Sequence, residues 1–163
     1  MPALNPARLD SLVAFAHHLA DASGEVIRRY YRQPIAVDSK PDDSPVTIAD
    51  REAEAALRHL IETTYPNHGI VGEEHEDVHE DAEFVWVLDP IDGTRSFITG
   101  KPLFGTLIAL CHATLPVIGV IDQPVNGERW IGCKGRPTML GNHNIATRAC
   151  SKLGDAVLFT TGH

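Results

Sequence analysis

The N-terminal part of the chain places apolar residues with the period of an α-helix. Asn5 followed by Pro6 is typical of a helix start, because asparagine caps the first amides and proline fits the first helical position. The pattern predicts a long amphipathic helix over about residues 6–32. Its apolar or small face consists of Leu9, Leu12, Val13, Ala16, Leu19, Ala20, Ser23, Val26, Ile27 and Tyr30.

A second helical pattern begins at Thr47, where the residues Thr47 to Asp50 fit the S/T-x-x-D/E start motif. Thr47 is the candidate N-cap, Asp50 lies in the first turn, and Pro66 closes the helix. Taken alone, the motif is explained equally well by capping and by a functional role. The apolar positions of this helix are Ala53, Ala56, Leu57, Leu60 and Ile61.

Beyond residue 83 the pattern changes to short apolar runs separated by glycine and proline, which is typical of strands. Ile70–Val71 forms a shorter run of the same kind before them. Two helices followed by consecutive strands predict an α+β fold, with two long helices packed on a mainly antiparallel sheet. The predicted strands cover residues 84–88, 105–112, 116–122, 128–133 and 156–160.

The stretch Asp89-Pro90-Ile91-Asp92-Gly93-Thr94 places two carboxylates directly after the predicted strand 84–88. Pro90 lacks an N–H and Asp-Gly is a turn pair, so we expect the strand to break here. Carboxylates at a rigid strand end suit Mg²⁺, and the amides of Gly93 and Thr94 suit a phosphate if they open a short helix. Either dipeptide alone is more often a simple turn former, and two further acidic segments strengthen the functional interpretation.

Those segments are Gly72-Glu73-Glu74, at another predicted strand end, and Lys40 to Asp50, a loop that leads into the second helix. In this order the motifs resemble the inositol monophosphatase superfamily of Mg²⁺-dependent, Li⁺-sensitive phosphatases, over about residues 36–110. The run from Asp92 to Leu110 is most similar to the bacterial histidinol-phosphate phosphatase branch. Inositol phosphatases carry Thr-Asn where this chain has Arg95-Ser96, so an inositol phosphate ranks second as substrate.

The resemblance implies a set of metal ligands. Glu73, Asp89 and the carbonyl oxygen of Ile91 would hold a first Mg²⁺, while Asp89 and Asp92 would contribute to a second. The complete enzyme would use two or three ions, and paired ions about 3.5–4 Å apart clamp the attacking and leaving oxygens of a phosphate ester.

Catalytic and substrate contacts are implied in the same way. A metal-activated water would be positioned by Glu73 and the Thr94 hydroxyl, and Asp50 would lie beside a further, weaker metal with Lys40 near it. The reaction would be hydrolysis of histidinol phosphate in histidine biosynthesis. The implied substrate-binding residues are Asp92, Gly93, Thr94 and Arg95.

At 163 residues the chain is shorter than this superfamily usually is. We therefore expect residues 1–163 to be the N-terminal α+β part, with about 140–163 the start of a truncated C-terminal α/β part. The missing part would supply the Asp that completes the second metal site.

The amino-acid composition limits the classes of molecule that the protein is expected to bind. The 14 basic and 22 acidic residues give a net charge of −8, which argues against a nucleic-acid partner. Three cysteines without metal-site spacing suggest reduced thiols in a cytoplasmic protein, and the chain has no apolar run of membrane-spanning length. We expect a small phosphorylated metabolite as substrate and a homo-oligomer, a dimer, as the assembly.

The spacing of the acidic residues argues against two other classes of protein. A haloacid-dehalogenase-type phosphatase needs two aspartates two positions apart, whereas Asp89 and Asp92 are three apart, and the EF-hand calcium loop is absent. A purely structural or oligomerising fragment stays open. Beyond Glu73, the acidic and histidine-containing segment up to Glu83 is interpreted as a solvated mobile loop, and Trp86 and Trp130 as core residues.

Overall fold

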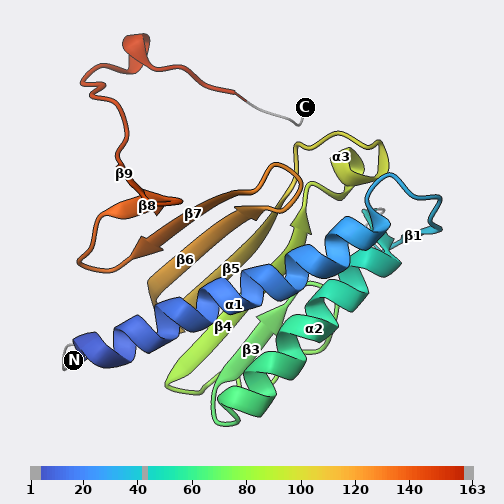
Figure 1. Ribbon diagram of the computed structural model, residues 1–163, viewed down its shortest axis with the longest axis horizontal. Helices are drawn as coiled ribbons and strands as arrows, with labels where there is room; N and C mark the ends of the chain where they lie inside the picture. The colour runs from blue at the N-terminus through green and yellow to red at the C-terminus, as the bar shows by residue number, and fades with distance from the viewer. Residues whose placement is uncertain (1–4, 42–43, 160–163) are drawn as a thin grey trace.

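The structure is a computed structural model that describes residues 5–41 and 44–159. Two helices lie side by side across one face of a twisted sheet (Figure 1). The elements in chain order are α1 (Pro6–Tyr30), β1 (Val37–Ser39), β2 (Pro45–Thr47), α2 (Ile48–Thr64), β3 (Gly69–Gly72), β4 (Phe84–Asp92), α3 (Thr94–Ile98), β5 (Gly105–His112), β6 (Leu115–Gln123), β7 (Glu128–Cys133), β8 (Thr138–Leu140), β9 (His143–Ile145) and a 3₁₀ turn η1 (Leu153–Asp155).

Both predicted long helices are present and begin where their capping residues indicated. The Asn5 side chain accepts a hydrogen bond from the Ala7 amide at 2.9 Å, and α1 ends at Tyr30, two residues before the predicted end. Thr47 and Asp50 form a reciprocal capping box at the start of α2. No helix within residues 5–41 and 44–159 is long and apolar enough to cross a membrane.

A seven-stranded sheet runs in the order β3-β4-β5-β6-β7-β8-β9, and only the β3–β4 pair is parallel. The predicted α+β class with a mainly antiparallel sheet is thereby confirmed. β1 and β2 form a separate antiparallel pair beside the start of α2. Neither this pair nor β8 and β9 were predicted, because each of these strands has only three residues and carries no clear alternation.

The predicted strand 84–88 continues to Asp92, so the expectation that it breaks at Pro90 is wrong. The pairing with β5 shifts register between Asp89 and Asp92, which is the signature of a bulge. Pro90 lies within this bulge, between the paired positions Asp89 and Asp92, so its missing N–H interrupts no register pair with β5. The Thr106 hydroxyl donates to the Pro90 carbonyl at 2.9 Å and holds the bulge in place.

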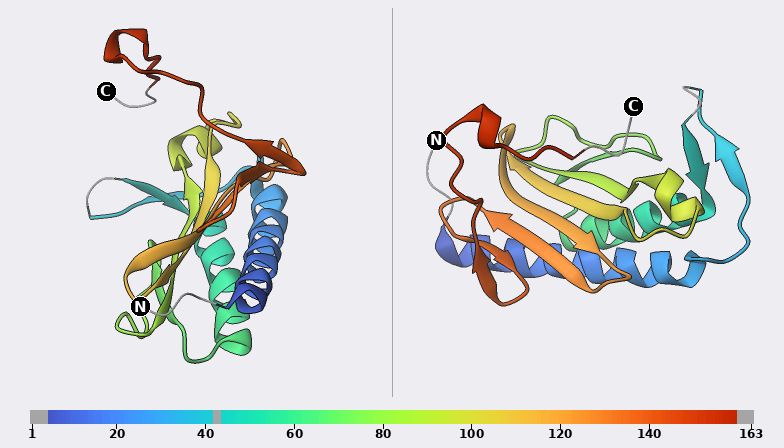
Figure 2. Two further views of the ribbon diagram at one scale, coloured as in Figure 1. Left: turned by 90° about the vertical axis from the view of Figure 1, so that its left-hand side faces the viewer. Right: turned by 90° about the horizontal axis from the view of Figure 1, so that it is seen from above.

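The hydrophobic core lies between the helices and one face of the sheet. Trp86 is completely buried there and meets Phe15 of α1 edge to face at 5.5 Å between ring centres. The opposite face has no helix over it among the described residues, as Figure 2 shows. Val87 and Ile121 are 39% and 50% exposed on it, and Trp130 is half-buried rather than in the core.

The predicted strand at residues 156–160 is not formed in its described part, residues 156–159, and residue 160 lies outside the described range. From the end of β9 to residue 159 the described chain runs as irregular backbone, apart from η1. Leu158 and Phe159 are 90% and 89% exposed. An apolar run forms a strand only where a neighbouring strand takes its hydrogen bonds, and residues 156–159 have no such neighbour among the described residues.

Candidate active site

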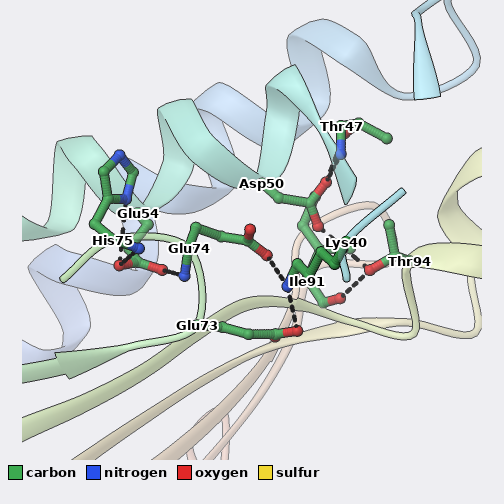
Figure 3. Close-up of polar contacts among 9 residues, drawn as sticks. All are labelled: Lys40, Thr47, Asp50, Glu54, Glu73, Glu74, His75, Ile91 and Thr94. Carbon is green, nitrogen blue, oxygen red and sulfur yellow. Dashed lines mark hydrogen bonds and ion pairs between the residues drawn. The ribbon is translucent and has the colours of Figure 1, made fainter. Parts of the chain in front are cut away.

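Three segments that are distant in the sequence meet at one end of the sheet (Figure 3). They are the residues after β3, the bulged end of β4 with α3, and the first turn of α2. Parallel pairing sets Gly72 opposite Leu88, so the residues that follow, Glu73 and Asp89, come to lie together. The motif residues predicted from the sequence are therefore brought to one place by the register of β3 on β4.

Glu73 and Asp89 form a close acidic pair. Burial, the charge of Glu73, a hydrogen bond shared with Glu73 and the charge of Asp92 raise the pKa of Asp89 to about 7. The Asp89 Oδ1 atom is buried and has no hydrogen-bond partner among the described residues. A buried carboxylate oxygen without a donor is costly, so this pair favours either a retained proton or a bound cation.

Lys40 connects the two glutamates that follow β3. Its Nζ lies 2.7 Å from Glu73 Oε1 and 2.7 Å from Glu74 Oε1. Burial lowers the pKa of Lys40, but the hydrogen bonds to Glu73 and Glu74 outweigh it and leave the pKa raised. The structure places Lys40 against Glu73 and Glu74, where its ammonium compensates part of the negative charge. Its predicted place near a weaker metal beside Asp50 stays a prediction.

Asp50 and Thr94 are linked across the site. The Thr94 hydroxyl lies 3.3 Å from Asp50 Oδ1 and 3.1 Å from the Ile91 carbonyl oxygen, both within donating distance. Asp50 Oδ2 accepts from the Thr47 amide at 2.8 Å and from the Thr47 hydroxyl at 2.6 Å. Burial raises the pKa of Asp50 against these hydrogen bonds. Asp50, the acidic residue of the capping box, therefore also orients the Thr94 hydroxyl towards the site.

Gly93 starts the short helix α3 that the sequence predicted. Its φ of 98° lies in the left-handed region, and a Cβ there would come 2.9 Å from the Leu103 carbonyl oxygen. Only glycine fits both restrictions. The amides of Ser96 and Phe97 donate to the Gly93 carbonyl oxygen at 2.8 and 3.1 Å. The Thr94 and Arg95 amides precede them in the first turn, where a helix offers no acceptor, which leaves them to other acceptors. Asp92 and Arg95, on either side of this turn, are exposed.

The arrangement of possible metal ligands at the site matches a hard cation such as Mg²⁺ only in part. Within the described ranges, no three acidic, histidine or cysteine side chains are already arranged to hold a metal. The acidic pair of Glu73 and Asp89, with the Ile91 carbonyl, offers oxygen atoms, which Mg²⁺ prefers. The orphaned Asp89 Oδ1 marks the position at which a cation would remove the greatest electrostatic cost.

Glu54 and Arg58 were not predicted to belong to the site. Both are buried on α2, and they hold the backbone of residues 74–76, so the segment after Glu73 is fixed at its start rather than solvated throughout. The sequence shows that the two charges are four positions apart and can pair on one helix face, but such pairs are usually exposed, so it does not indicate their burial.

Comparison with known proteins agrees with the motifs. The sequence profile of the inositol monophosphatase family matches residues 8–163. The chain is 54% identical to the bifunctional phosphatase IMPL2, chloroplastic, of Arabidopsis thaliana, over 97% of this chain and 46% of that protein. It is 37% identical to a histidinol-phosphatase of Chlorobaculum parvum, over 89% of this chain and 57% of that protein.

Solved structures give the same result for the fold. An inositol monophosphatase from Zymomonas mobilis superposes with a TM-score of 0.75 at 48% identity, over 86% of this chain and 54% of that one. The extragenic suppressor protein suhB of Bartonella henselae superposes with a TM-score of 0.81 at 29% identity, over 86% and 55%. The chain therefore spans about half the length of the relatives that it matches.

Proposed function

Because the chain belongs to the inositol monophosphatase family, we propose that the protein of which it supplies this half is a Mg²⁺-dependent hydrolase of phosphate monoesters. The observation that carries the proposal is the acidic pair of Glu73 and Asp89, with one carboxylate oxygen buried and unpartnered. The fold could be stabilised without such an acidic pair. A role of Glu73 and Asp89 in binding cations beside a phosphate would explain why the pair is present.

Each residue of the site has a role that follows from its position. Glu73, Asp89, the Ile91 carbonyl and Asp92 would hold the cations, and the first-turn amides at Gly93 and Thr94 would receive phosphate oxygens. When bound, divalent cations neutralise the phosphate and lower the pKa of water. The Thr94 hydroxyl would accept a hydrogen bond from the attacking water and pass its own proton to the Asp50 carboxylate, and Glu73 would help to position the water.

Arg95 follows the phosphate turn directly and is exposed, so it would contact either the substrate or a second subunit. We assign it to the substrate, because a guanidinium beside a phosphate turn pairs with anionic oxygen. Its removal is then expected to weaken substrate binding more than turnover, which a comparison of KM with kcat for Arg95→Gln measures.

For the substrate we propose histidinol phosphate. The support comes from relatives described as histidinol-phosphatases, at 37% identity in Chlorobaculum parvum and 38% in Mycobacterium tuberculosis. In a protein of the relatives' full length that contains this chain, kcat/KM for L-histidinol phosphate is expected to exceed that for inositol 1-phosphate at least about tenfold. Equal or reversed preference in a competition assay would refute this substrate.

Inositol 1-phosphate is the second candidate. It is favoured by the 48% identity to a structure described as an inositol monophosphatase. The same competition assay decides between the two substrates. Inhibition by Li⁺ would support the family mechanism in either case, without distinguishing the esters.

The expected assembly is a homodimer, and the expected location is the cytoplasm, in keeping with unpaired thiols at Cys111, Cys133 and Cys150. For this chain alone we expect little turnover, because by the proposed ligand assignment the described residues would supply one cation site and part of another. We also expect self-association through the open sheet face around Val87 and Ile121. Phosphate release and light scattering on the purified chain test both. Full turnover by a monodisperse monomer would contradict them.

A further inference from the structure

α2 carries a buried ion pair on the side that faces the segment after β3. Glu54 is completely buried, Arg58 is 7% exposed, and Arg58 Nε lies 2.7 Å from Glu54 Oε1. Removing two charges from water is expensive, and an apolar pair of similar volume often stabilises a fold as well or better. The pair therefore calls for an explanation from its contacts.

Those contacts converge on three consecutive residues. Glu54 Oε2 accepts the amide of Glu74 at 2.8 Å, and Glu54 Oε1 accepts the amide of His75 at 3.2 Å (Figure 3). Arg58 donates to the carbonyl of His75 at 3.1 Å and to that of Glu76 at 2.9 Å. Two charged side chains thus hold both kinds of backbone group in residues 74–76, directly after Glu73.

Gly72 shows how closely the pair approaches this segment. A Cβ at Gly72 would overlap the Glu54 carboxylate and would come 2.6 Å from Arg58 Nη2. The backbone of Gly72 is not in the left-handed region, so the requirement for glycine comes from this contact alone. The ion pair consequently lies against the chain at Gly72, before Glu73, and holds it by a hydrogen bond at Glu74, after Glu73.

Charge-assisted hydrogen bonds of this kind define direction as well as distance. Among the described residues, the hydrogen bonds of the Glu54 and Arg58 side chains go only to each other and to residues 74–76. None goes to the sheet or to α1. The contacts are thus concentrated on the short segment that positions Glu73 beside Asp89.

We propose that Glu54 and Arg58 are positioning residues that set the backbone at Glu73, so that its carboxylate reaches the cation site with Asp89. The inference rests on the proposed function in taking that acidic pair as a cation site. Neither Glu54 nor Arg58 touches the cation or the substrate. They act through the backbone of residues 72–76.

The test is Glu54→Gln, which keeps the shape but cannot accept both amides of Glu74 and His75. Asp122→Asn is the matched control, because Asp122 is also a buried carboxylate paired with an arginine, Arg129, at a distance of 2.6 Å, but on β6. Three quantities are measured for each protein: Mg²⁺ affinity by calorimetry, hydrogen exchange of the amides in residues 72–76 without metal, and the urea midpoint.

Glu54→Gln should weaken Mg²⁺ binding at least about tenfold, as loss of a partner that orients a metal ligand typically does. It should also accelerate exchange at Glu74 and His75 at least about tenfold, in proportion to the lost protection. Asp122→Asn should lower the urea midpoint and leave both other quantities unchanged. If Glu54→Gln does not fold, Arg58→Lys replaces it, with the same changes in the same direction but smaller.

Unchanged Mg²⁺ affinity and unchanged exchange in a folded Glu54→Gln or Arg58→Lys would overturn the inference. Equal loss of Mg²⁺ affinity in Asp122→Asn would do the same, because it would show a general effect of lost stability. If the parent chain binds no Mg²⁺ at all, the proposed function fails instead. Hydrogen exchange at the Glu74 and His75 amides then decides whether Glu54 and Arg58 hold residues 74–76.

Discussion

Two pairs of carboxylates border the candidate site, Asp50 and Glu54 on α2, and Glu73 and Asp89 after β3 and within β4. Asp50 and Glu54 are the more deeply buried, and each has several hydrogen-bond donors. Glu73 and Asp89 have fewer. Asp89 Oδ1 has none among the described residues, and the pKa of Asp89 rises to about 7.

The difference separates two uses of the same side chain. Where donors surround a buried carboxylate, its charge is compensated inside the protein and it organises backbone. Where two carboxylates face each other with one oxygen unpartnered, compensation must come from a proton or a cation. We therefore interpret Asp50 and Glu54 as residues that hold the surrounding structure in place, and Glu73 and Asp89 as the proposed cation ligands.

Replacement of Asp89 is expected to have the largest effect. In a full-length protein that contains this chain, Asp89→Asn should reduce Mg²⁺-dependent hydrolysis to less than about a tenth, because the proposed cations lose a shared ligand. Folding should be kept, since one of two repelling charges is removed. Phosphate release measures the rate, with Asp81→Asn, at an exposed position, as the control. A rate above a tenth of the parent's would count against the assignment.

The two substitutions Asp50→Ala and Asp89→Asn should change the stability of the fold in opposite directions. Asp50→Ala leaves the buried Thr47 amide and hydroxyl without their acceptor, so the free energy of unfolding should fall by about 1–3 kcal/mol. Asp89→Asn, measured without metal at about pH 8, should raise it. Urea denaturation of both variants checks the signs. The same sign for both would remove the distinction between the two pairs.

The pKa of Asp89 predicts how stability depends on pH. Its folded value of about 7 lies above the ordinary 3.8, so between these values the folded chain keeps a proton that the unfolded chain has lost. Stability without metal should therefore fall as pH rises from about 4 to about 7.

Because the site is partly open to solvent, we expect a difference of about 1–2 kcal/mol between about pH 5.5 and 7.5, relative to Asp89→Asn. Urea denaturation at the two pH values measures it, and saturating Mg²⁺ should abolish it. A wild-type chain with the same pH dependence as Asp89→Asn would show that Asp89 titrates normally.

An exposed ion pair between α2 and β1 provides the smallest expected effect. Arg51 Nη1 lies 2.8 Å from Asp38 Oδ2, and both side chains are largely open to solvent. Arg51→Gln should change the free energy of unfolding by less than about 0.5 kcal/mol, because water screens such pairs. A loss as large as that of Asp50→Ala would mean that burial is not what separates the contributions of the charges on α2.

The sequence predicted those parts of the molecule that depend on local pattern. The helices α1 and α2 follow from their caps and apolar faces, and the central strands from their apolar runs between turns. The motifs around Glu73, Asp89 and Thr94 came together as expected, because each follows or ends a predicted element.

Features that depend on neighbours distant in the sequence were not predictable in this way. The continuation of β4 past Pro90 requires knowing that its pairing with β5 resumes at Asp92, opposite Gly105. The ion pair of Glu54 and Arg58 is understood only once residues 74–76 are seen beside α2. The apolar run at 156–159 resembles a strand, yet pairing decides whether it becomes one.

Calorimetric titration of this chain with Mg²⁺ at about pH 8 tests the central claim most directly, that Glu73 and Asp89 form a cation site. We predict one tight site, lost in Asp89→Asn and retained in Asp81→Asn, because only the first substitution removes the carboxylate whose Oδ1 has no hydrogen-bond partner among the described residues. No binding by the parent chain, or equal binding by Asp89→Asn, would contradict the claim.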